Sequence, residues 1–481
     1  MNKAIVWLRR DLRLDDNPAL LAALQECREL IPLYIFNSAE EAPWAPGAAS
    51  RWWLHHSMDA LDGQLRKRGS RLVIRQGDSL AALQELIREH EITHLFWNRL
   101  YEPAIIERDS RIKATLTDAG IQCNSFNGSL LFEPWEIQTG QKTPYKVFTA
   151  FWKTCLKTGL PRLEPQPAPS SLPPIPRGLE SGVLDTLQLL PSIPWDSGFH
   201  DIWKPGRASA LQELDRFIEE AIGNYNSDRD LPGYPGTSRL SPHLHFGEIS
   251  PHQILESVRN MTGFQENMAS TGENVYVKQL GWRDFAHHLL FHFPQTAEEP
   301  LDTRFGNYPW NWKENATELL SAWQQGRTGF PIVDAGMREL WHTGWMHNRV
   351  RMIVASLLTK NLGIHWLEGA RWFWDTLVDA DLANNSMGWQ WTAGCGADAA
   401  PFFRIFNPVS QSERFDPQGV YIRKWVPELA KLPDKALHAP SLQKAELLSH
   451  AGIRLGEDYP FPVVDLKQTR ERALDQWKRI K

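Results

Sequence analysis

The sequence predicts two parts: an α/β N-terminal domain with a Rossmann-like parallel sheet, and an all-α C-terminal domain. Short apolar runs alternate with helix-like segments as far as Ala119. A proline-rich stretch at Pro161–Gly178 then interrupts the pattern, because proline continues neither a helix nor a central strand. From Ala208 onward the pattern is almost wholly helical. Alternating strands and helices are typical of a parallel sheet with helices on both faces, and a long series of helices is typical of a bundle-like assembly.

The N-terminal elements are predicted from apolar runs and helix-start signals. Asp16-Asn17-Pro18 supplies an N-cap and a first-turn proline for an Ala/Leu-rich helix. We expect strands at Ala4–Leu8, Leu30–Phe36, Arg71–Arg75 and Thr93–Trp97, and further helices at Ser50–Arg68, Ser79–His90 and Glu102–Ala119. Ligands of such folds bind at the carboxyl ends of the strands. The first strand is followed by WLRRDLRL and not by GxGxxG, so a standard dinucleotide site is not expected.

The length of 481 residues favours two domains. We expect an α/β domain at 1–130, a surface connector at 131–205 and a helical domain at 206–481. Net charge is −5, so a nucleic-acid surface must be a local basic patch. No apolar run approaches the roughly 18 residues that span a bilayer, and the N-terminus lacks a signal-peptide pattern. Four cysteines without motif spacing fit reduced thiols, so we expect a cytoplasmic protein.

The motif GYPGTSRLSPHLHFGEISP brings hydroxyls and free backbone N–H groups to the start of a predicted helix. Thr237, Ser238, Arg239, Leu240 and Ser241 form this segment, and Pro242 falls in the first turn. Such an arrangement suits an anion such as a pyrophosphate. Simple helix capping is the alternative.

Two further helical segments carry amide, indole and thioether groups on one face. Gln279 and Trp282 are three residues apart, and Asn348 and Met352 are four apart, so each pair shares a helix face. An amide can bond the edge of a flat base while an indole stacks on its ring. The alternative for Met352 is core packing. His288 and His292 have the spacing of a metal pair but no third ligand, so no metal is expected.

The segment DTLVDADLANN places Asp379, Asp381, Asn384 and Asn385 in an apolar helix-like stretch. Buried carboxylates need partners, and Arg351 is the plausible partner for one of them. Trp389 lies one helical turn after Asn385, in a chain with 22 tryptophans. Packing is the alternative explanation for a row of tryptophans.

Together, TSRLS, GWMHNRVRM, DTLVDADLANNSMGWQW and FFRIFNP resemble the DNA photolyase/cryptochrome family, and GWMHNRVRM resembles its cyclobutane pyrimidine dimer photolyases, most like the bacterial ones. The resemblance covers nearly the whole chain. It implies FAD in the helical domain and an antenna chromophore in the α/β domain, methenyltetrahydrofolate rather than deazaflavin. It also implies a monomer that repairs UV-damaged DNA by light-driven electron transfer to a flipped-out dimer.

The resemblance assigns roles residue by residue. The lesion pocket comprises Trp282, Gln279, Asn348, Arg349, Met352 and Trp391. The flavin contacts are Tyr225, Thr237, Ser238, Arg239, Leu240, Ser241, Tyr276, Arg283, Arg351, Asp379, Asp381 and Asn385. Trp389, Trp366 and Trp312 form the electron-transfer row, with Trp310 as a competitor for its outer end, and Glu102 belongs to the antenna site. The neutral amide of Asn385 is expected opposite flavin N5.

The sequence departs from the family pattern at Gln279, where dimer photolyases usually carry glutamate. A glutamine can bond a thymine edge but supplies no anion, which leaves the lesion type and the efficiency open. Two alternatives also remain: a cryptochrome-type blue-light photoreceptor without repair activity, and a dark flavoprotein oxidoreductase. Asn385 and the pairing of Trp282 with Met352 favour a repair enzyme.

Overall fold

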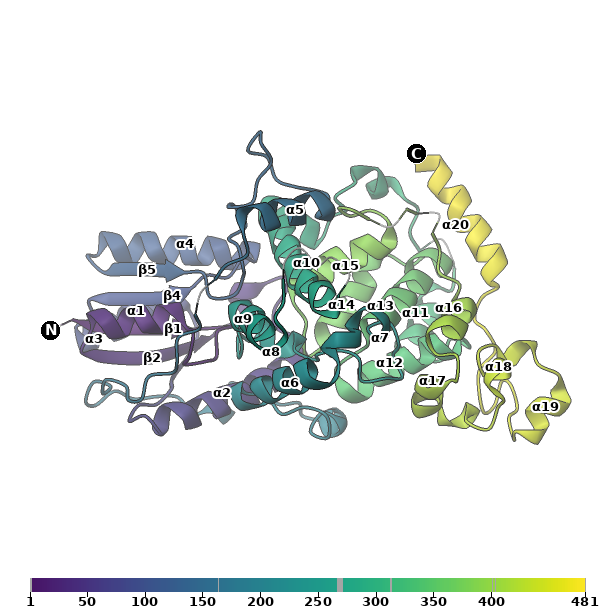
Figure 1. The fold of residues 1–481 in the computed structure, drawn as a ribbon, viewed down its shortest axis with the longest axis horizontal. Helices are drawn as coiled ribbons and strands as arrows, with labels where there is room; N and C mark the ends of the chain where they lie inside the picture. The colour runs from purple at the N-terminus through teal and green to yellow at the C-terminus, as the bar shows by residue number, and fades with distance from the viewer. Residues whose placement is uncertain are drawn as a thin grey trace.

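The computed structural model describes residues 2–162, 164–265, 271–311, 314–399, 401–402 and 404–480. Its N-terminal part is a five-stranded parallel sheet in the order β3-β2-β1-β4-β5. The strands are β1 (Lys3–Leu8), β2 (Glu29–Phe36), β3 (Val73–Gln76), β4 (His94–Asn98) and β5 (Gln122–Phe126). Figure 1 shows this sheet on the left and the helical part on the right. The predicted fold class is therefore confirmed.

Helices cover both faces of the sheet because successive residues of β1 point to opposite sides. Ala4, Val6 and Leu8 pack with α1 (Pro18–Glu26) and α2 (Ala48–Arg66). Ile5 and Trp7 pack on the other side with α3 (Ser79–His90) and α4 (Pro103–Asp118). The strand β5 was not predicted, because its sequence QCNSF lacks an apolar run. It lies at the sheet edge, where its residues are half-exposed or exposed.

The remaining helices belong to the C-terminal part, in a largely helical assembly around two apolar clusters. They are α6 (Arg207–Glu220), α7 (Tyr225–Asp228), α8 (Ser241–His245), α9 (Pro251–Thr262), α10 (Gly272–His292), α11 (Ala316–Gln324), α12 (Pro331–Thr343), α13 (Asn348–Ser356), α14 (Trp366–Thr376), α15 (Leu382–Ala393), α16 (Pro408–Phe415), α17 (Val420–Trp425), α18 (Asp434–Leu437), α19 (Ala445–His450) and α20 (Leu466–Ile480).

The segment expected to be a surface connector contains a helix, α5 (Phe148–Thr158), that is buried along one face only. Phe148, Phe151 and Cys155 are buried in the same apolar cluster as α10. Apolar residues three and four apart on a helix share a face. That face packs in the cluster shared with α10, and α5 lies beside α10 in the ribbon (Figure 1). Later connector residues run along the α/β part, where Leu172 and Gly182 donate backbone hydrogen bonds to Arg68 and Ile74.

The two parts meet at the loop that follows β1. The Arg13 Nη1 group donates to the Gly247 carbonyl at 2.9 Å, and Arg207 forms an ion pair with Asp15. Gly247 has φ +63°, and an added Cβ would lie 2.2 Å from the Arg10 carbonyl oxygen, so only glycine allows this approach. In the described part of the chain, no helix is long and apolar enough to cross a membrane.

Candidate functional site

Asp379 and Asp381 lie in the turn that joins α14 to α15, not inside a helix as the sequence pattern indicated. Asp381 is the N-cap of α15, since its Oδ1 accepts hydrogen bonds from the backbone and side-chain nitrogens of Asn384 at 2.9 and 2.6 Å. Aspartate stabilises this position because its side chain satisfies a free N–H group at the helix start. The cap fixes the first turn of α15, which carries Asn385.

The expected partnership of Arg351 with a buried carboxylate is confirmed. Arg351 Nη2 lies 2.8 Å from Asp379 Oδ2 and 3.1 Å from Oδ1, and its Nε donates to the Met346 carbonyl at 2.8 Å. The guanidinium also lies 6.0 Å from the ring centroid of Trp345, over which Arg239 packs at 5.3 Å. Two of the predicted flavin-site arginines therefore converge on one indole.

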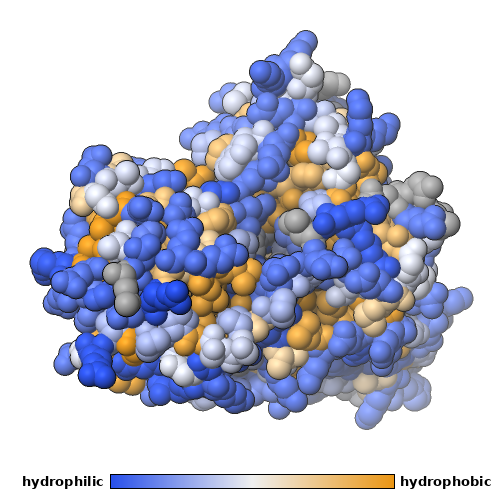
Figure 2. All heavy atoms as spheres, turned by 60° about the vertical axis from the view of Figure 1, so that its left-hand side comes forward, coloured by the Kyte–Doolittle hydropathy of each residue, from blue (hydrophilic) through white to orange (hydrophobic). Residues whose placement is uncertain are grey.

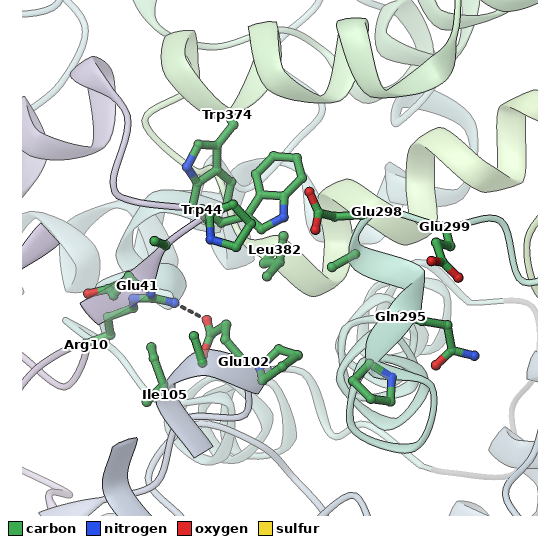
Figure 3. A pocket seen from close by; sticks show the side chains of 16 residues that line it. Arg10, Glu41, Trp44, Glu102, Ile105, Gln295, Glu298, Glu299, Trp374 and Leu382 are labelled. Atoms are coloured by element: carbon green, nitrogen blue, oxygen red, sulfur yellow. Dashed lines mark hydrogen bonds and ion pairs between the residues drawn. The ribbon is translucent and has the colours of Figure 1, made fainter. Parts of the chain in front are cut away.

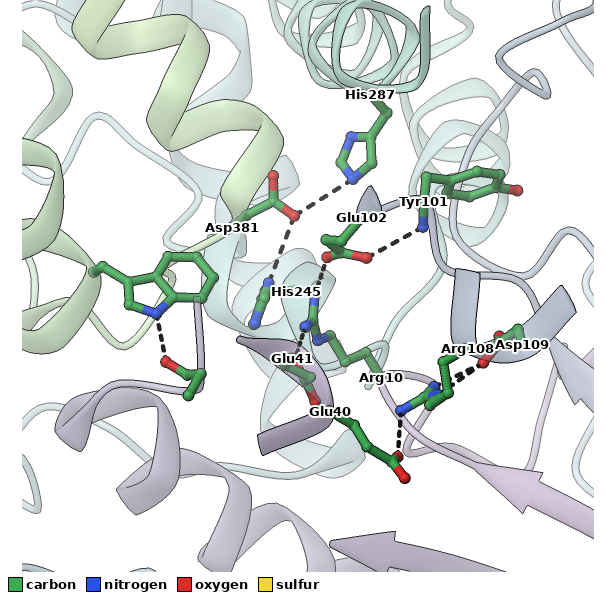
Figure 4. A network of polar contacts seen from close by, with 12 residues as sticks. Arg10, Glu40, Glu41, Tyr101, Glu102, Arg108, Asp109, His245, His287 and Asp381 are labelled. Carbon is green, nitrogen blue, oxygen red and sulfur yellow. Dashed lines mark hydrogen bonds and ion pairs between the residues drawn. The ribbon is translucent and has the colours of Figure 1, made fainter. Parts of the chain in front are cut away.

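The second oxygen of Asp381 faces two buried histidines that the sequence motifs did not single out (Figure 4). His287 Nε2 lies 3.4 Å and His245 Nδ1 lies 3.6 Å from Asp381 Oδ2. Burial alone would raise the pKa of Asp381, but the two histidines outweigh it and hold that pKa well below its usual range. No spacing signal links α8, α10 and this turn, because the contacts are long-range in sequence.

Helix α10 carries Gln279, Trp282 and Arg283. The Trp282 indole stacks on Phe148 with ring centroids 3.7 Å apart and planes at 11°. Gln279 donates to the carbonyl of Val275 at 2.9 Å, one turn earlier, so its amide oxygen carries no bond to the helix. The Arg283 guanidinium donates to the carbonyl of Ser129, which follows β5. Phe148 was not predicted as part of this wall, because it lies far away in the sequence.

Tyr225 and Tyr276 lie together, as expected for two residues of one site. Their ring centroids are 5.3 Å apart at 83°. The pKa of Tyr276 is raised because the phenol is buried. The segment from Thr237 to Ser241 leads into α8, which begins at Ser241 with proline in its first turn, as predicted.

Helix α13 begins at Asn348 and presents Arg349 and Met352 in contact, with Arg349 Nη1 3.8 Å from Met352 Sδ. Arg349 is also ion-paired to Asp230 at 2.8 Å, and its guanidinium lies 4.3 Å from the Phe415 ring centroid. Asp230 is a further site residue that the sequence pattern did not indicate.

The tryptophans of the expected electron-transfer row are mostly buried. Trp389 packs against Phe373 with centroids 5.0 Å apart, and Trp366 contacts His365 at 5.8 Å. Trp312 lies outside the described residues. Trp310 is described, and its ring lies 5.1 Å from the same His365. Trp366, His365 and Trp310 therefore form consecutive ring contacts, and the choice between Trp310 and Trp312 stays a prediction.

Glu102, the expected antenna-site residue, is buried. It is the N-cap residue of α4 and forms an ion pair with Arg10, and both line a pocket between the two parts of the chain (Figure 3). Burial opposes the charge of Glu102, but Arg10 outweighs it and lowers the pKa of Glu102. Figure 3 shows Trp44 and Trp374 along one wall and Glu298 and Glu299 across from Arg10.

Both halves of the chain match known families. Residues 4–171 match the model described as "DNA photolyase", and residues 276–479 match "FAD binding domain of DNA photolyase". Deoxyribodipyrimidine photo-lyase from Agrobacterium fabrum is 46% identical over 99% of this chain and 98% of that protein. Cryptochrome-1 from Arabidopsis thaliana is 39% identical over 98% of this chain and 69% of its own length.

Solved structures agree with these relatives. A bacterial class III photolyase from Agrobacterium tumefaciens superposes with a TM-score of 0.94 at 46% identity, covering 100% of this chain and 98% of that one. A cryptochrome from Synechocystis gives 0.89 at 30% identity, covering 100% and 99%. The fold and the matched models define a protein with a photolyase-type FAD-binding domain. The chain belongs to the DNA photolyase/cryptochrome family.

The residues present fit a flavin. Asn385 Nδ2 donates to the Ala370 carbonyl at 2.9 Å, which leaves Oδ1 as an acceptor. The buried Ser386 hydroxyl and Trp389 indole nitrogen have no protein hydrogen-bond partner, and such buried polar groups are normally satisfied. A polar ligand beside α15 would satisfy such groups. His288 and His292 both bond to the Pro134 carbonyl, and the described residues hold no cluster of three or more metal-ligating groups.

We expect His347 to make the stability of the fold sensitive to acid. Its Nδ1 accepts from the Arg349 backbone N–H at 3.2 Å and so caps α13, and burial lowers the pKa of His347 from 6.5 to about 3. The unfolded chain therefore binds more protons below about pH 6.5, and His347 loses its stabilising effect as the pH falls from there toward 3.

We expect the melting temperature to decrease over this range. His347→Asn keeps a capping acceptor without titrating and should flatten the decrease; an unchanged slope in melts between about pH 5 and 8 would refute this.

Proposed function

We propose that this chain is a deoxyribodipyrimidine photo-lyase that repairs cyclobutane pyrimidine dimers in DNA with light. The observation that carries the proposal is the similarity of 46% over 99% of the chain to a protein of that name. Trp282 on α10 and Met352 on α13, with neutral Asn385 on α15, support it over the photoreceptor alternative, because they supply a lesion wall and an uncharged flavin partner.

In this proposal the chain binds and orients, and the cofactor does the difficult chemistry. Bound reduced FAD would supply the photoexcited electron that opens the cyclobutane ring. Its phosphates would be held by the Thr237–Ser241 segment, and its ring would lie by Asn385, with Arg351 and Asp379 beside it. The flipped-out dimer would stack on Trp282, with Gln279 and Asn348 at the base edges. Arg349 and Met352 would close the rim, and Trp391, half-buried on α15, is the proposed opposite wall.

Purified protein incubated with dimer-containing DNA in blue light and in the dark tests this function. Repair only in light supports it. Normal flavin photoreduction without repair would indicate a cryptochrome-type photoreceptor, and light-independent flavin turnover would indicate an oxidoreductase.

Trp282→Ala should weaken binding of dimer-containing DNA. Base–aromatic stacking contributes about 1–3 kcal/mol per base, so we expect a loss of roughly ten- to a hundredfold, with little change for undamaged DNA. Fluorescence anisotropy with matched damaged and undamaged duplexes measures the ratio. Trp282→Phe is the control, since it keeps a ring that stacks on Phe148. Equal weakening toward both duplexes would show that Trp282 acts on DNA in general and not on the lesion.

We also propose that the pocket at Glu102 holds the antenna chromophore, and that it is a methenyltetrahydrofolate. Carboxylates at Glu298 and Glu299 would accept from the N–H edge of a pterin, and Trp44 or Trp374 would pack on its ring. An absorption spectrum of the purified protein tests this, because folate and deazaflavin bands differ. Loss of the folate band in Glu102→Gln, with FAD retained, would support the site.

The cellular compartment and the oligomeric state are also proposals. We infer a cytoplasmic protein, because the four cysteines are free, as is usual in a reducing compartment. We also propose that the chain is a monomer, as the resemblance to its family implies. Light scattering of the purified protein tests the oligomeric state, and a mass of twice the chain would refute it.

A further inference from the structure

His287 is held between two acceptors, which fixes where its protons lie. Its Nδ1 is 3.0 Å from the carbonyl oxygen of Arg283, which can only accept a hydrogen bond. Its Nε2 faces the carboxylate of Asp381 at 3.4 Å, which is also an acceptor. Both ring nitrogens are satisfied together only when both carry protons. The geometry therefore matches an imidazolium and not a neutral imidazole.

His245 does not have this arrangement, although it faces the same oxygen. Its Nδ1 lies 3.6 Å from Asp381 Oδ2 and has no partner in hydrogen-bond geometry. Burial lowers the pKa of His245, so it is the neutral member of the pair. One oxygen of Asp381 therefore has one charged and one neutral histidine beside it (Figure 4). The other oxygen caps α15 through Asn384.

The surrounding charges come from every element packed around His287. From α10 itself they are Arg283 and Asp284, and the Tyr101 ring lies 6.2 Å away, edge-on. The loop after β1 and the start of α4 supply the Arg10–Glu102 ion pair. Burial would lower the pKa of His287, but Asp381 outweighs it and raises that pKa above its ordinary value of 6.5.

We propose that His287 is a positioning residue whose imidazolium holds Asp381, and with it the first turn of α15 that carries Asn385, in the arrangement that retains the flavin. The inference rests on the proposed function, since the flavin contacts of Asp381 and Asn385 belong to that proposal. Loss of the proton from His287 would leave the buried carboxylate without its nearest cation.

The raised pKa of His287 determines the direction in which flavin retention changes with pH. His287 is charged below its folded-state pKa, so its contribution is fully present below about pH 6.5 and is lost as the pH rises through the raised pKa. Flavin retention should therefore fall on the alkaline side. Arg10 is not expected to cause this fall, because arginine stays charged throughout.

Two measurements on the purified flavin-loaded protein test the proposal. The first follows ¹³C-labelled histidine rings by NMR from about pH 5 to 10, with the His287 signal assigned by its loss in His287→Arg. The second measures flavin retained after dialysis across the same range in wild type, His287→Arg, His287→Gln and the control His292→Gln. His292 is on the same helix but bonds to Pro134 at 3.0 Å and does not face Asp381.

We expect His287 to titrate above 6.5, and His287→Arg to retain flavin without the alkaline loss. Below the His287 pKa, His287→Gln should bind flavin on the order of ten- to a hundredfold more weakly than wild type, because a buried charge has lost its partner. This difference should shrink as the pH rises and the wild-type imidazolium loses its proton. His292→Gln should follow wild type. Titration of His287 at or below 6.5, or an unaltered pH profile in His287→Arg, would overturn the proposal. If His287→Gln fails to fold, the NMR titration and the arginine variant still decide. The titration needs no repair activity, so a failure of the proposed function remains distinguishable.

Discussion

Replacing Gly369 with alanine is expected to destabilise the helical part and to impair flavin photoreduction. A Cβ at this position would lie 2.0 Å from Cη2 and 2.4 Å from Cζ3 of the Trp389 ring. Trp389 cannot readily move away, because its ring packs against Phe373 at 5.0 Å and Trp323 at 6.1 Å. Overpacking of this kind typically costs about 1–3 kcal/mol. Either α14 and α15 separate or the indole shifts, and both outcomes disturb the proposed electron-transfer row.

Denaturant unfolding and blue-light photoreduction of the flavin in the presence of a reductant measure the two effects. Gly63→Ala is a matched control, since Gly63 lies inside α2 and an added Cβ would meet no atom within 4 Å. That variant should be stabilised by about 0.5–1 kcal/mol, because alanine is the better helix former. A Gly369→Ala protein as stable and as photoreducible as wild type would show that Trp389 has room to move.

Much of the fold is predictable because local patterns determine it. The apolar run of β1 and the Asn17–Pro18 start of α1 gave elements within a residue or two of those observed. The strand β5 is absent from the prediction because an edge strand needs no apolar run. Helix α5 was hidden between proline-rich and polar segments, although its Phe148, Phe151 and Cys155 have helical spacing.

The site residues fall into the same two groups, those that local sequence patterns indicate and those that depend on contacts between distant segments. Pairs that share one helix, such as Gln279 and Trp282, follow from spacing alone. Asp381 could have been recognised as an N-cap, because it directly precedes the helical pattern and Asn384. The partners Phe148, His245 and Asp230 could not be found this way. They meet α10, the α14–α15 turn and α13 across long sequence separations, and a single sequence carries no record of such contacts.

Arg351→Leu is expected to have the largest effect on stability. The substitution leaves Asp379, whose side chain is only 4% exposed, without its cation, and it removes the bond from Arg351 to the Met346 carbonyl. Removing one partner of a buried pair typically costs about 3–5 kcal/mol. Because Arg351 itself is 24% exposed, solvent reduces this effect, and we expect about 2–4 kcal/mol.

The double variant Arg351→Leu/Asp379→Asn separates the buried charge from the lost contacts. Asparagine removes the charge and keeps the shape, so the double variant should be more stable than Arg351→Leu alone, even though each change removes part of the same interaction. Urea unfolding of wild type, Arg351→Leu, Asp379→Asn and the double variant gives the coupling energy. Flavin content after gel filtration shows whether the site survives. Additive losses would mean that Asp379 is solvated independently of Arg351, and the pair would then contribute nothing to holding the α14–α15 turn.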